Sequence, residues 1–239
     1  MGRTAVWTAI AERLRAEIAS GQRRPGDKLP SEAELAARFG VNRHTVRRAL
    51  ADLAAAGLVH ARRGAGVFVH ARPVDYALGR RTRFSTNLAA VGREAGRQTL
   101  SLETRRASED EALALALEPG GMVHALTGIS TADGQPIALF RSVFPAARLP
   151  DLPALLDRHS SITAALAEHG IADYTRAETR LTAKRADAAT ALHLHLREGE
   201  PILRAIAINV GPDGVPVEYG HTWFAGDRVT LNIRPEDGG

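Results

Sequence analysis

Cysteine is absent from the 239-residue chain, and only 5% of its residues are aromatic. The lack of cysteine excludes disulfides, thiolate zinc sites, iron–sulfur clusters and cysteine nucleophiles. No apolar run reaches the roughly 18–20 residues of a membrane-spanning helix, and the N-terminal stretch carries charges every few positions without an apolar signal-peptide region. The hydrophobic fraction of 44% suffices for a buried core. We therefore expect a soluble, cytoplasmic protein with one large domain or two smaller ones.

Positive charge is concentrated in the first third of the chain. Residues 1–72 contain 13 Lys and Arg against 6 Asp and Glu, which gives a formal charge of +7. Residues 73–239 contain 18 against 21, which gives a formal charge of −3. The value of +4 for the whole chain hides this division. Such asymmetry predicts an anionic partner for one domain only.

The basic first third has the pattern of three short helices and a hairpin. Apolar residues at helical spacing predict helices over residues 4–20, 31–39 and 43–56. Ser31 and Glu34 form a capping-box pattern at the start of the second helix, and Asn42 is a suitable N-cap for the third. Two short β segments follow, at 59–61 and 67–70, joined by a basic, glycine-rich tip. This order is that of a winged helix-turn-helix.

A winged helix-turn-helix over residues 1–71 implies that the anionic partner is double-stranded DNA. The exposed face of the third helix carries donors and acceptors of the kind that reach phosphates and base edges. The candidate DNA-binding residues on this face are Asn42, Arg43, His44, Thr45, Arg47 and Arg48. The alternative is a solvated basic helix in an ordinary helical subdomain. Agreement among the helix lengths, the caps and the hairpin favours the DNA-binding interpretation.

The rest of the chain is expected to form a linker, residues 72–82, and a second domain, residues 83–239, that contains an internal repeat. Residues 105–120 align with residues 184–199 at an offset of 79, and Asp-Gly turns recur at 133 and 213. Each half therefore has the order strand, short helix, strand, Asp-Gly turn, strand. Two such halves predict an α+β domain, an antiparallel sheet with helices, whose halves pack about a pseudo-twofold axis.

Several motifs resemble known bacterial regulators. Residues 29–50, 57–58 and 62–69 resemble the GntR superfamily of transcriptional regulators. Residues 83–88, 133–137 and 214–219 resemble the UTRA effector-binding domain of the HutC subfamily, whose fold is like that of chorismate lyase. The stretches 42–49 and 72–88 narrow the resemblance to regulators of phosphonate-utilisation operons. The resemblance thus implies an N-terminal winged helix-turn-helix and a C-terminal chorismate-lyase-like antiparallel sheet with helices.

For the first domain, the resemblance implies direct contacts to operator DNA. Arg43, Thr45 and Arg47 match operator-contacting positions, and Arg63 and Gly64 match the wing. Regulators of this type bind short inverted repeats as homodimers, which agrees with the symmetry of helix-turn-helix dimers. Many relatives have a basic residue where this chain has Ala33, so we expect one phosphate contact to be missing.

For the second domain, the resemblance implies a pocket for a small anionic effector that bears a phosphate or phosphonate. Hydroxyls, backbone N–H groups and arginines hold such groups. Ser85 and Ser161 match phosphate-binding serines, each at an expected helix start, and a plain N-cap is the structural alternative for Ser85. The candidate effector-binding residues are Arg83, Ser85, Arg141, Ser161, Arg180, Glu218 and Tyr219. Many relatives carry an arginine near Thr127, and this chain lacks it. Either Arg141 replaces the missing positive charge, or the pocket takes a different ligand.

The resemblance implies an effector-responsive repressor of phosphonate uptake or metabolism. A regulator of another catabolic operon, for an aminosugar phosphate or histidine, is the first alternative. A chorismate-lyase-like enzyme is the second, although the sequence has no Gly-x-Ser-x-Gly, P-loop or His-Glu-x-x-His motif. His193 and His195 are two apart on an expected helix and point to different sides, so neither a metal nor a cofactor is expected. The acidic remainder of the chain disfavours an architectural DNA-binding protein.

Overall fold

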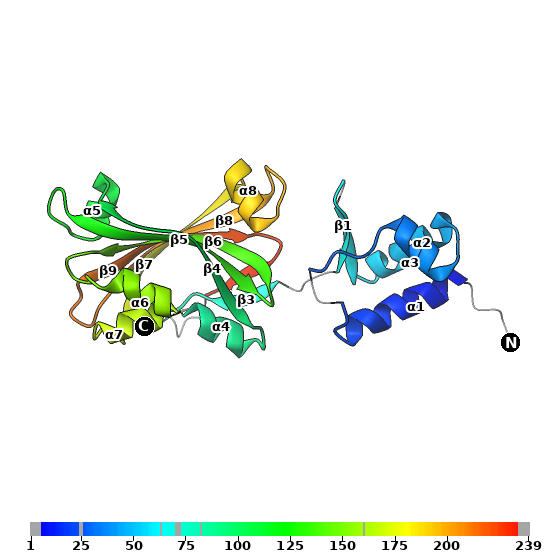
Figure 1. The fold of residues 1–239 in the computed structure, drawn as a ribbon, viewed down its shortest axis with the longest axis horizontal. Coiled ribbons are helices and arrows are strands. Elements are labelled where there is room, and N and C mark those ends of the chain that lie inside the picture. Colours follow the sequence, from blue (N-terminus) through cyan, green and yellow to red (C-terminus); the bar gives the residue numbers. More distant parts are fainter. Residues whose placement is uncertain are drawn as a thin grey trace. The chain divides into compact units, whose positions relative to one another are not determined.

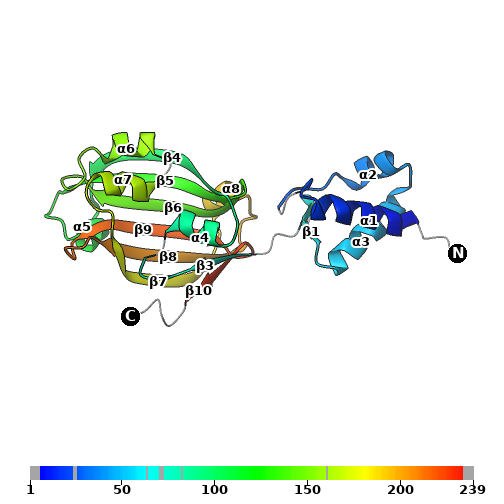
Figure 2. The same ribbon diagram turned by 90° about the horizontal axis from the view of Figure 1, so that it is seen from below.

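The chain folds into two compact units, Met1–Arg72 and Pro73–Gly239. The computed structural model describes residues 6–23, 26–62, 64–69, 73–81, 83–159 and 161–233. Figure 1 and Figure 2 show the course of the chain in each unit. No helix in these ranges is long and apolar enough to cross a membrane.

The first unit contains the three helices and the hairpin that the sequence predicts. Its elements are α1 (Val6–Ala19), α2 (Glu32–Phe39), α3 (Arg43–Ala55), β1 (Val59–Arg62) and β2 (Gly66–Val69). Both expected caps form: the Ser31 hydroxyl and the Glu34 carboxylate make a capping box, and the Asn42 side chain accepts from the Thr45 N–H. The apolar stripes of the three helices meet the hairpin in one core that includes Leu14 and Leu53, both fully buried. This core holds α2 and α3 in the helix-turn-helix arrangement.

The second unit is built on a six-stranded sheet with the order β4-β5-β6-β9-β8-β7, antiparallel throughout. Its strands are β4 (Ala95–Arg106), β5 (Met122–Ala132), β6 (Gln135–Pro145), β7 (Thr175–Arg185), β8 (Pro201–Val210) and β9 (Pro216–Ala225). Exchanging the first half (β4, β5 and β6) for the second (β7, β8 and β9) gives the same order read from the other edge of the sheet, as the repeat requires. The α+β class and the strand–helix–strand–turn–strand order of each half are therefore confirmed.

Helices cover both faces of this sheet (Figure 1). The short helices are α4 (Phe84–Ala90), α5 (Glu109–Ala114), α6 (Leu152–Arg158), α7 (Ile162–Glu168) and α8 (Ala188–Leu194). Helices α4, α6 and α7 lie on one face, and α5 and α8 lie on the other. Each face of the sheet has its own core, because successive side chains along β6 point to opposite faces. Phe140 packs among residues of α6 and α7, while Leu139 packs with residues of α8.

The expected linker, 72–82, is corrected in part by the structure. Residues Val74–Ala77 form β3, which pairs in parallel with β10 (Val229–Asn232). Val74 and Tyr76 alternate with exposed Asp75 and are buried in a core with Phe224. The strand is short, and its partner lies about 155 residues further along the chain, so local periodicity could not reveal it.

Candidate functional sites

The exposed face of α3 presents the first candidate site. Val46, Ala49, Leu50 and Leu53 face the core, which leaves Arg43, His44 and Arg47 exposed on the other side of the helix. The Asn42 Oδ1 atom accepts from both the backbone N–H and the hydroxyl of Thr45, each at 2.9 Å. The N-terminal half of α3 therefore carries polar groups of fixed orientation on a surface that water reaches.

Two arginines of α3 have partners within the first unit. Arg47 donates from Nε to Oε1 of Glu32 at 3.0 Å and from Nη2 to Oε2 at 2.7 Å. The guanidinium of Arg48 lies over the indole of Trp7, with its carbon 4.6 Å from the ring centroid. The structure thus groups Asn42, Arg43, His44, Thr45 and Arg47, and it directs Arg48 toward α1. Gly64 of the wing is exposed, and Arg63 lies outside the described residues.

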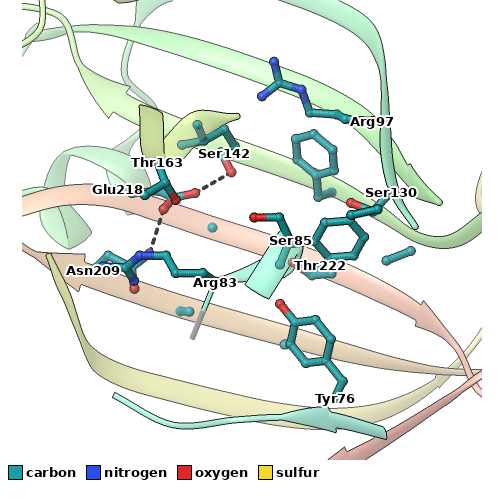
Figure 3. Close-up of a pocket in the computed structure, with 18 of the residues that line it drawn as sticks. Tyr76, Arg83, Ser85, Arg97, Ser130, Ser142, Thr163, Asn209, Glu218 and Thr222 are labelled. Carbon is teal, nitrogen blue, oxygen red and sulfur yellow. Dashed lines mark hydrogen bonds between the residues drawn. The ribbon is translucent and has the colours of Figure 1, made fainter. Parts of the chain in front are cut away.

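The second candidate site is a cavity of about 290 Å³ between the sheet and the helices α4 and α7 (Figure 3). Apolar residues such as Phe140 and Phe224 line it together with several polar side chains. Burial raises the pKa of Tyr76 and of Tyr174, so both phenols stay protonated and able to donate. The Tyr174 hydroxyl lies 2.9 Å from that of Thr163. A cavity of this kind, largely apolar with a few convergent polar groups, is typical of a small-molecule site.

Glu218 of β9 supplies the carboxylate of this cavity. Its side chain is 8% exposed. The Ser142 hydroxyl donates to Oε1 at 2.5 Å, and the Asn209 amide donates to Oε2 at 2.6 Å (Figure 3). Both oxygens accept hydrogen bonds from neutral groups, which is how a carboxylate is held in place without an ion pair.

Three arginines supply the positive charge of the cavity: Arg83, Arg97 and Arg176. Arg83 donates to the carbonyl of Tyr174 at 2.6 Å and lies over its ring at 3.5 Å. Arg97 donates from Nη2 to the carbonyl of His159 at 2.9 Å, and burial lowers its pKa. Arg97 Nη1 and Arg176 Nε are buried and find no acceptor among the described residues. Buried donors without an acceptor are uncommon and are a feature that a bound anion would satisfy.

The internal repeat relates two of these arginines. Arg97 pairs with Ser130 across β4 and β5, and Arg176 pairs with Asn209 across β7 and β8. Both members of the second pair are offset by 79 from the first, the same offset that the repeat shows elsewhere. The pseudo-twofold arrangement therefore brings one arginine from each half to a single cavity.

The structure brings together four of the seven candidate effector residues. Arg83, Ser85, Ser161 and Glu218 all line the cavity. Ser161 caps α7 by accepting from the Ala164 N–H at 3.3 Å, whereas Ser85 lies inside the first turn of α4, whose N-cap is Arg83. The structural alternative, a plain N-cap at Ser85, is therefore wrong. Figure 3 shows the Ser85 side chain projecting toward the middle of the cavity.

The other three candidates lie on the opposite face of the sheet. Arg141 donates to Glu111 at 2.9 Å, and Arg180 donates to Glu178 at 2.6 Å. The ring of Tyr219 packs edge-on against His221, with centroids 4.8 Å apart. Arg141 and Tyr219 each follow a cavity-lining residue on the same strand, and Arg180 is paired across the sheet with the neighbour of one. Because successive side chains on a strand point to opposite faces of the sheet, all three point away from the cavity. Arg141 consequently adds no charge to the lining of the cavity.

Sequence reasoning missed Arg97 and Arg176 as well as the partners of Glu218. The repeat held a usable signal, because its offset of 79 aligns the two arginines. Both arginines lie near the start of an outer strand, β4 or β7, and therefore precede the segments in which the repeat can be recognised. No comparable pattern marks Ser142, Asn209 or Thr163.

Comparison with known proteins agrees with this architecture. Residues 7–69 match the family of bacterial regulatory proteins named gntR, and residues 90–230 match the UTRA domain. An uncharacterised HTH-type transcriptional regulator of Rhizobium meliloti is 40% identical over 96% of this chain and 94% of the relative. The probable transcriptional regulator PhnF of Escherichia coli is 34% identical over 94% of this chain and 92% of the relative.

A solved structure shows the same arrangement of elements. The crystal structure of PhnF from Mycobacterium smegmatis covers 96% of this chain and 98% of its own, with 29% identity and a TM-score of 0.67. The winged-helix unit and the sheet unit with its cavity define a DNA-binding transcriptional regulator with an effector domain. The chain belongs to the GntR family of bacterial regulatory proteins, and it is of the HutC type because its second unit is a UTRA domain.

Proposed function

We propose that this regulator is a repressor of phosphonate uptake or metabolism. In this proposal a homodimer binds an inverted-repeat operator through α3 and the wing, and a small phosphate- or phosphonate-bearing effector in the cavity weakens that binding. The observation that carries the proposal is the pair of buried arginine nitrogens, Arg97 Nη1 and Arg176 Nε, without acceptors among the described residues. The similarity to two proteins named PhnF supports the choice of a phosphonate.

The proposed DNA contacts follow from the exposed half of α3. Arg43 and Arg47 can bind guanine O6 and N7 with two hydrogen bonds each, and His44 and Thr45 lie beside them. The Arg47 Nη1 atom remains available to a base, since its contacts to Glu32 use Nε and Nη2. Asn42 stays fixed by its bonds to Thr45 and serves as the cap that shapes the start of the helix.

Fluorescence anisotropy on DNA from upstream of the chain's own gene tests the DNA half of the proposal. Arg43→Ala and Arg47→Ala should each weaken specific binding by about 1–3 kcal/mol if these side chains read bases. Arg185→Ala is the matched control, because it removes the same charge from an exposed position in the second unit. Unchanged binding by both α3 variants would refute the assignment of the recognition helix.

Release of the same DNA tests the effector half. Adding an alkylphosphonate to the wild-type complex should lower the anisotropy at concentrations that saturate the cavity in calorimetry. Arg97→Met and Arg176→Met should bind operator DNA normally and require more ligand for release, because both residues line the cavity and belong to the second unit, outside α3 and the wing. If no phosphonate binds while a different metabolite phosphate does, the phosphonate assignment fails and the repressor assignment stands.

A further inference from the structure

Two helices of the second unit expose a leucine at equivalent positions of the internal repeat. Leu113 of α5 is 84% exposed and Leu192 of α8 is 73% exposed, the two largest values among the exposed large apolar side chains of the described residues. Their numbers differ by 79, the offset of the repeat. Leu115 and Leu194, two positions further along, are buried, so each exposed leucine lies on the side of its helix that faces away from the sheet. Exposed leucines at the same place in both halves indicate a surface that meets a partner.

An aromatic row on β9 connects the two helices across the same face of the sheet. Tyr219, His221 and Trp223 alternate with residues that line the cavity, so they point to the side of α5 and α8. Tyr219 packs with the cluster that contains Leu115, and Trp223 packs with the cluster that contains Leu194. The His221 ring lies between them, with its centroid 4.8 Å from that of Tyr219 and 5.8 Å from that of Trp223. All three side chains are half-buried, so solvent reaches the row.

We call this surface the α5–α8 face, and it consists of the two exposed leucines and the aromatic row between them. Burial lowers the pKa of His221, so the centre of the row is uncharged at neutral pH. The opposite face of the sheet is covered by α4, α6 and α7 around the cavity (Figure 1). The α5–α8 face is therefore the side of the sheet on which a partner can pack without closing the cavity.

The α5–α8 face has the size and the symmetry of an interface between two copies of the chain. Six strands of 10 to 12 residues make up the sheet. Such a sheet is roughly 24 Å wide and roughly 33 Å long, and its face approaches the roughly 800 Å² per partner that a standard interface buries. A twofold dimer uses the same surface on both copies. A face that presents equivalent groups in each half is suited to such a contact.

The charges of the two helices favour one way of pairing. The first turn of α5 carries the exposed acids Glu109 and Asp110, whereas α8 has the exposed alanines Ala188 and Ala189 at the equivalent positions. Packing α5 against the α5 of a second copy would set the acids against their own copies, where they repel. Packing α5 against the α8 of a second copy sets them against alanines. The apolar groups of the repeat are therefore symmetric, and its charges select the pairing.

We propose that the α5–α8 face joins two copies of this chain, with Leu113 of one copy against Leu192 of the other on both sides of a twofold axis. This inference rests on the proposed function, because it assigns the surface through which the proposed homodimer forms. It adds that the dimer is held by the second unit, and that the cavity of each copy lies on the outer side of its sheet.

Analytical ultracentrifugation of the full-length chain tests the surface. Leu113→Glu and Leu192→Glu should each raise the dissociation constant of the dimer by about 100-fold, because each places a charge in an apolar contact twice per dimer. Leu181→Glu is the matched control and should leave the constant unchanged. Leu181 is 38% exposed on the edge strand β7 and is paired with Ala205, which lines the cavity, so it points to the other face. An unchanged constant in both the Leu113 and Leu192 variants, or loss of the dimer in Leu181→Glu alone, would overturn the inference.

The absence of cysteine from the chain allows a test of the pairing in the intact dimer. A dilute mixture of Leu113→Cys chains and Leu192→Cys chains should form a covalent dimer with a short thiol-reactive cross-linker, because position 113 of one copy lies against position 192 of the other. Neither variant should cross-link by itself, and Leu181→Cys should not cross-link alone or in a mixture. Cross-linking of Leu113→Cys to itself, or no cross-link in the first mixture, would overturn the inference.

Failure of the inference and failure of the proposed function are distinguishable. If the wild-type chain sediments as a monomer at concentrations that saturate the inverted repeat, the proposed homodimer fails and the inference fails with it. If the wild-type chain sediments as a dimer that both glutamate variants retain, only the inference fails. Because both leucines are exposed, a thermal melt should show that the glutamate variants fold as stably as wild type. If either melts early, the cross-linking experiment decides by itself.

Discussion

Glu32 is the residue that fixes the orientation of Arg47 on α3. The two hydrogen bonds between them are short, and the Arg47 side chain is still 62% exposed. The Arg47 guanidinium holds the pKa of Glu32 below its usual value, and Arg43 and His44 add smaller effects. An exposed pair of this kind adds little to stability. If Arg47 reads a base as proposed, the consequence of the pair lies in DNA recognition, because a pre-oriented arginine discriminates between bases better than a mobile one.

Glu32→Gln should therefore reduce specificity more than affinity. The loss of a negative charge near the phosphates raises non-specific binding, while the freed Arg47 loses its orientation toward a base. We expect the ratio of operator to random-DNA affinity to fall by about tenfold, or roughly 1.4 kcal/mol. Anisotropy at fixed salt with both DNAs measures the ratio.

A double-mutant cycle separates positioning from simple charge effects. In an Arg47→Ala background, Glu32→Gln should lower the specificity ratio much less, because only the charge effect remains once the residue that it positions is gone. A drop of the same size in both backgrounds would show that Glu32 acts independently of Arg47.

A substitution of Arg176 distinguishes a role in ligand binding from a role in stability. Its Nε atom is buried without an acceptor among the described residues, so the guanidinium contributes little to folding. Arg176→Met should keep the free energy of unfolding within about 1 kcal/mol of wild type, since it replaces an unsatisfied polar group with an apolar one. Loss of a charge-assisted hydrogen bond should weaken phosphonate binding by about 1.5–3 kcal/mol.

Urea unfolding and calorimetry on the same Arg176→Met sample check both expectations. Ser85→Ala is a useful companion variant, because it removes a hydroxyl from the cavity without changing its charge. A large loss of stability with unchanged ligand affinity would assign Arg176 to the fold and remove it from the site.

Single-residue alternation explains which site residues the sequence could place. Neighbours on a strand point to opposite faces, so Glu218 and Tyr219 cannot both line one cavity. The resemblance pointed to both residues but gave no strand register. The pairing of β9 with β8 places Glu218 opposite Asn209, and both residues line the cavity. Ser85 and Ser161 could be located because they lie beside helix starts, which leave local signals.

At the scale of elements, helix α5 is held to the sheet by one buried carboxylate. Glu111 completes a capping box with Ser108, and it also binds Arg105 of β4 and Arg141 of β6. Arg105 lowers the pKa of Glu111 to about 2, with help from the Ser108 N–H and from Arg141. Because the folded-state pKa is below that of the unfolded chain, the carboxylate stabilises the fold at neutral pH.

This shift predicts an acid-sensitive second unit. The contribution of Glu111 is fully present above a pH of about 4.5 and is lost as the pH falls toward about 2. With a shift of this size it amounts to roughly 3 kcal/mol. Urea unfolding between pH 7 and pH 3 should show the decline in wild type and a flatter profile in Glu111→Gln. Equal slopes for the two proteins would contradict the assignment.

Elements with local signals could be predicted from the sequence, and those that depend on distant partners could not. The helices of the first unit and the strands around Asp133-Gly134 follow from caps, apolar spacing and turn chemistry. Strand β3 forms by pairing with β10, and no local sequence pattern encodes the register between the two strands. The repeat was the more informative signal, since it predicted two halves about a pseudo-twofold axis, and the symmetric strand order of the sheet agrees with that prediction.

At the scale of the whole molecule, the two units divide the chemistry between them. The +7 charge lies in the unit that carries α3, and the −3 charge lies in the unit that carries the cavity. Each unit has its own buried core, so each can respond to its own ligand. Two binding sites alone do not make a regulator. The effector must also bind the DNA-free state more tightly than the DNA-bound state.

Reciprocity gives the sharpest test of that coupling. If the effector lowers operator affinity by some factor, bound operator must lower effector affinity by the same factor. We expect a factor of roughly 5–150, which is typical of allosteric coupling. Anisotropy measures the operator affinity with and without a saturating alkylphosphonate, and calorimetry measures the effector affinity with and without saturating operator, in the same buffer. Arg47→Ala should weaken the DNA arm without changing the effector affinity of the DNA-free protein. Coupling through the cavity must reach a plateau once the cavity is saturated, so an operator affinity that keeps falling as more ligand is added would instead indicate direct competition for the α3 face.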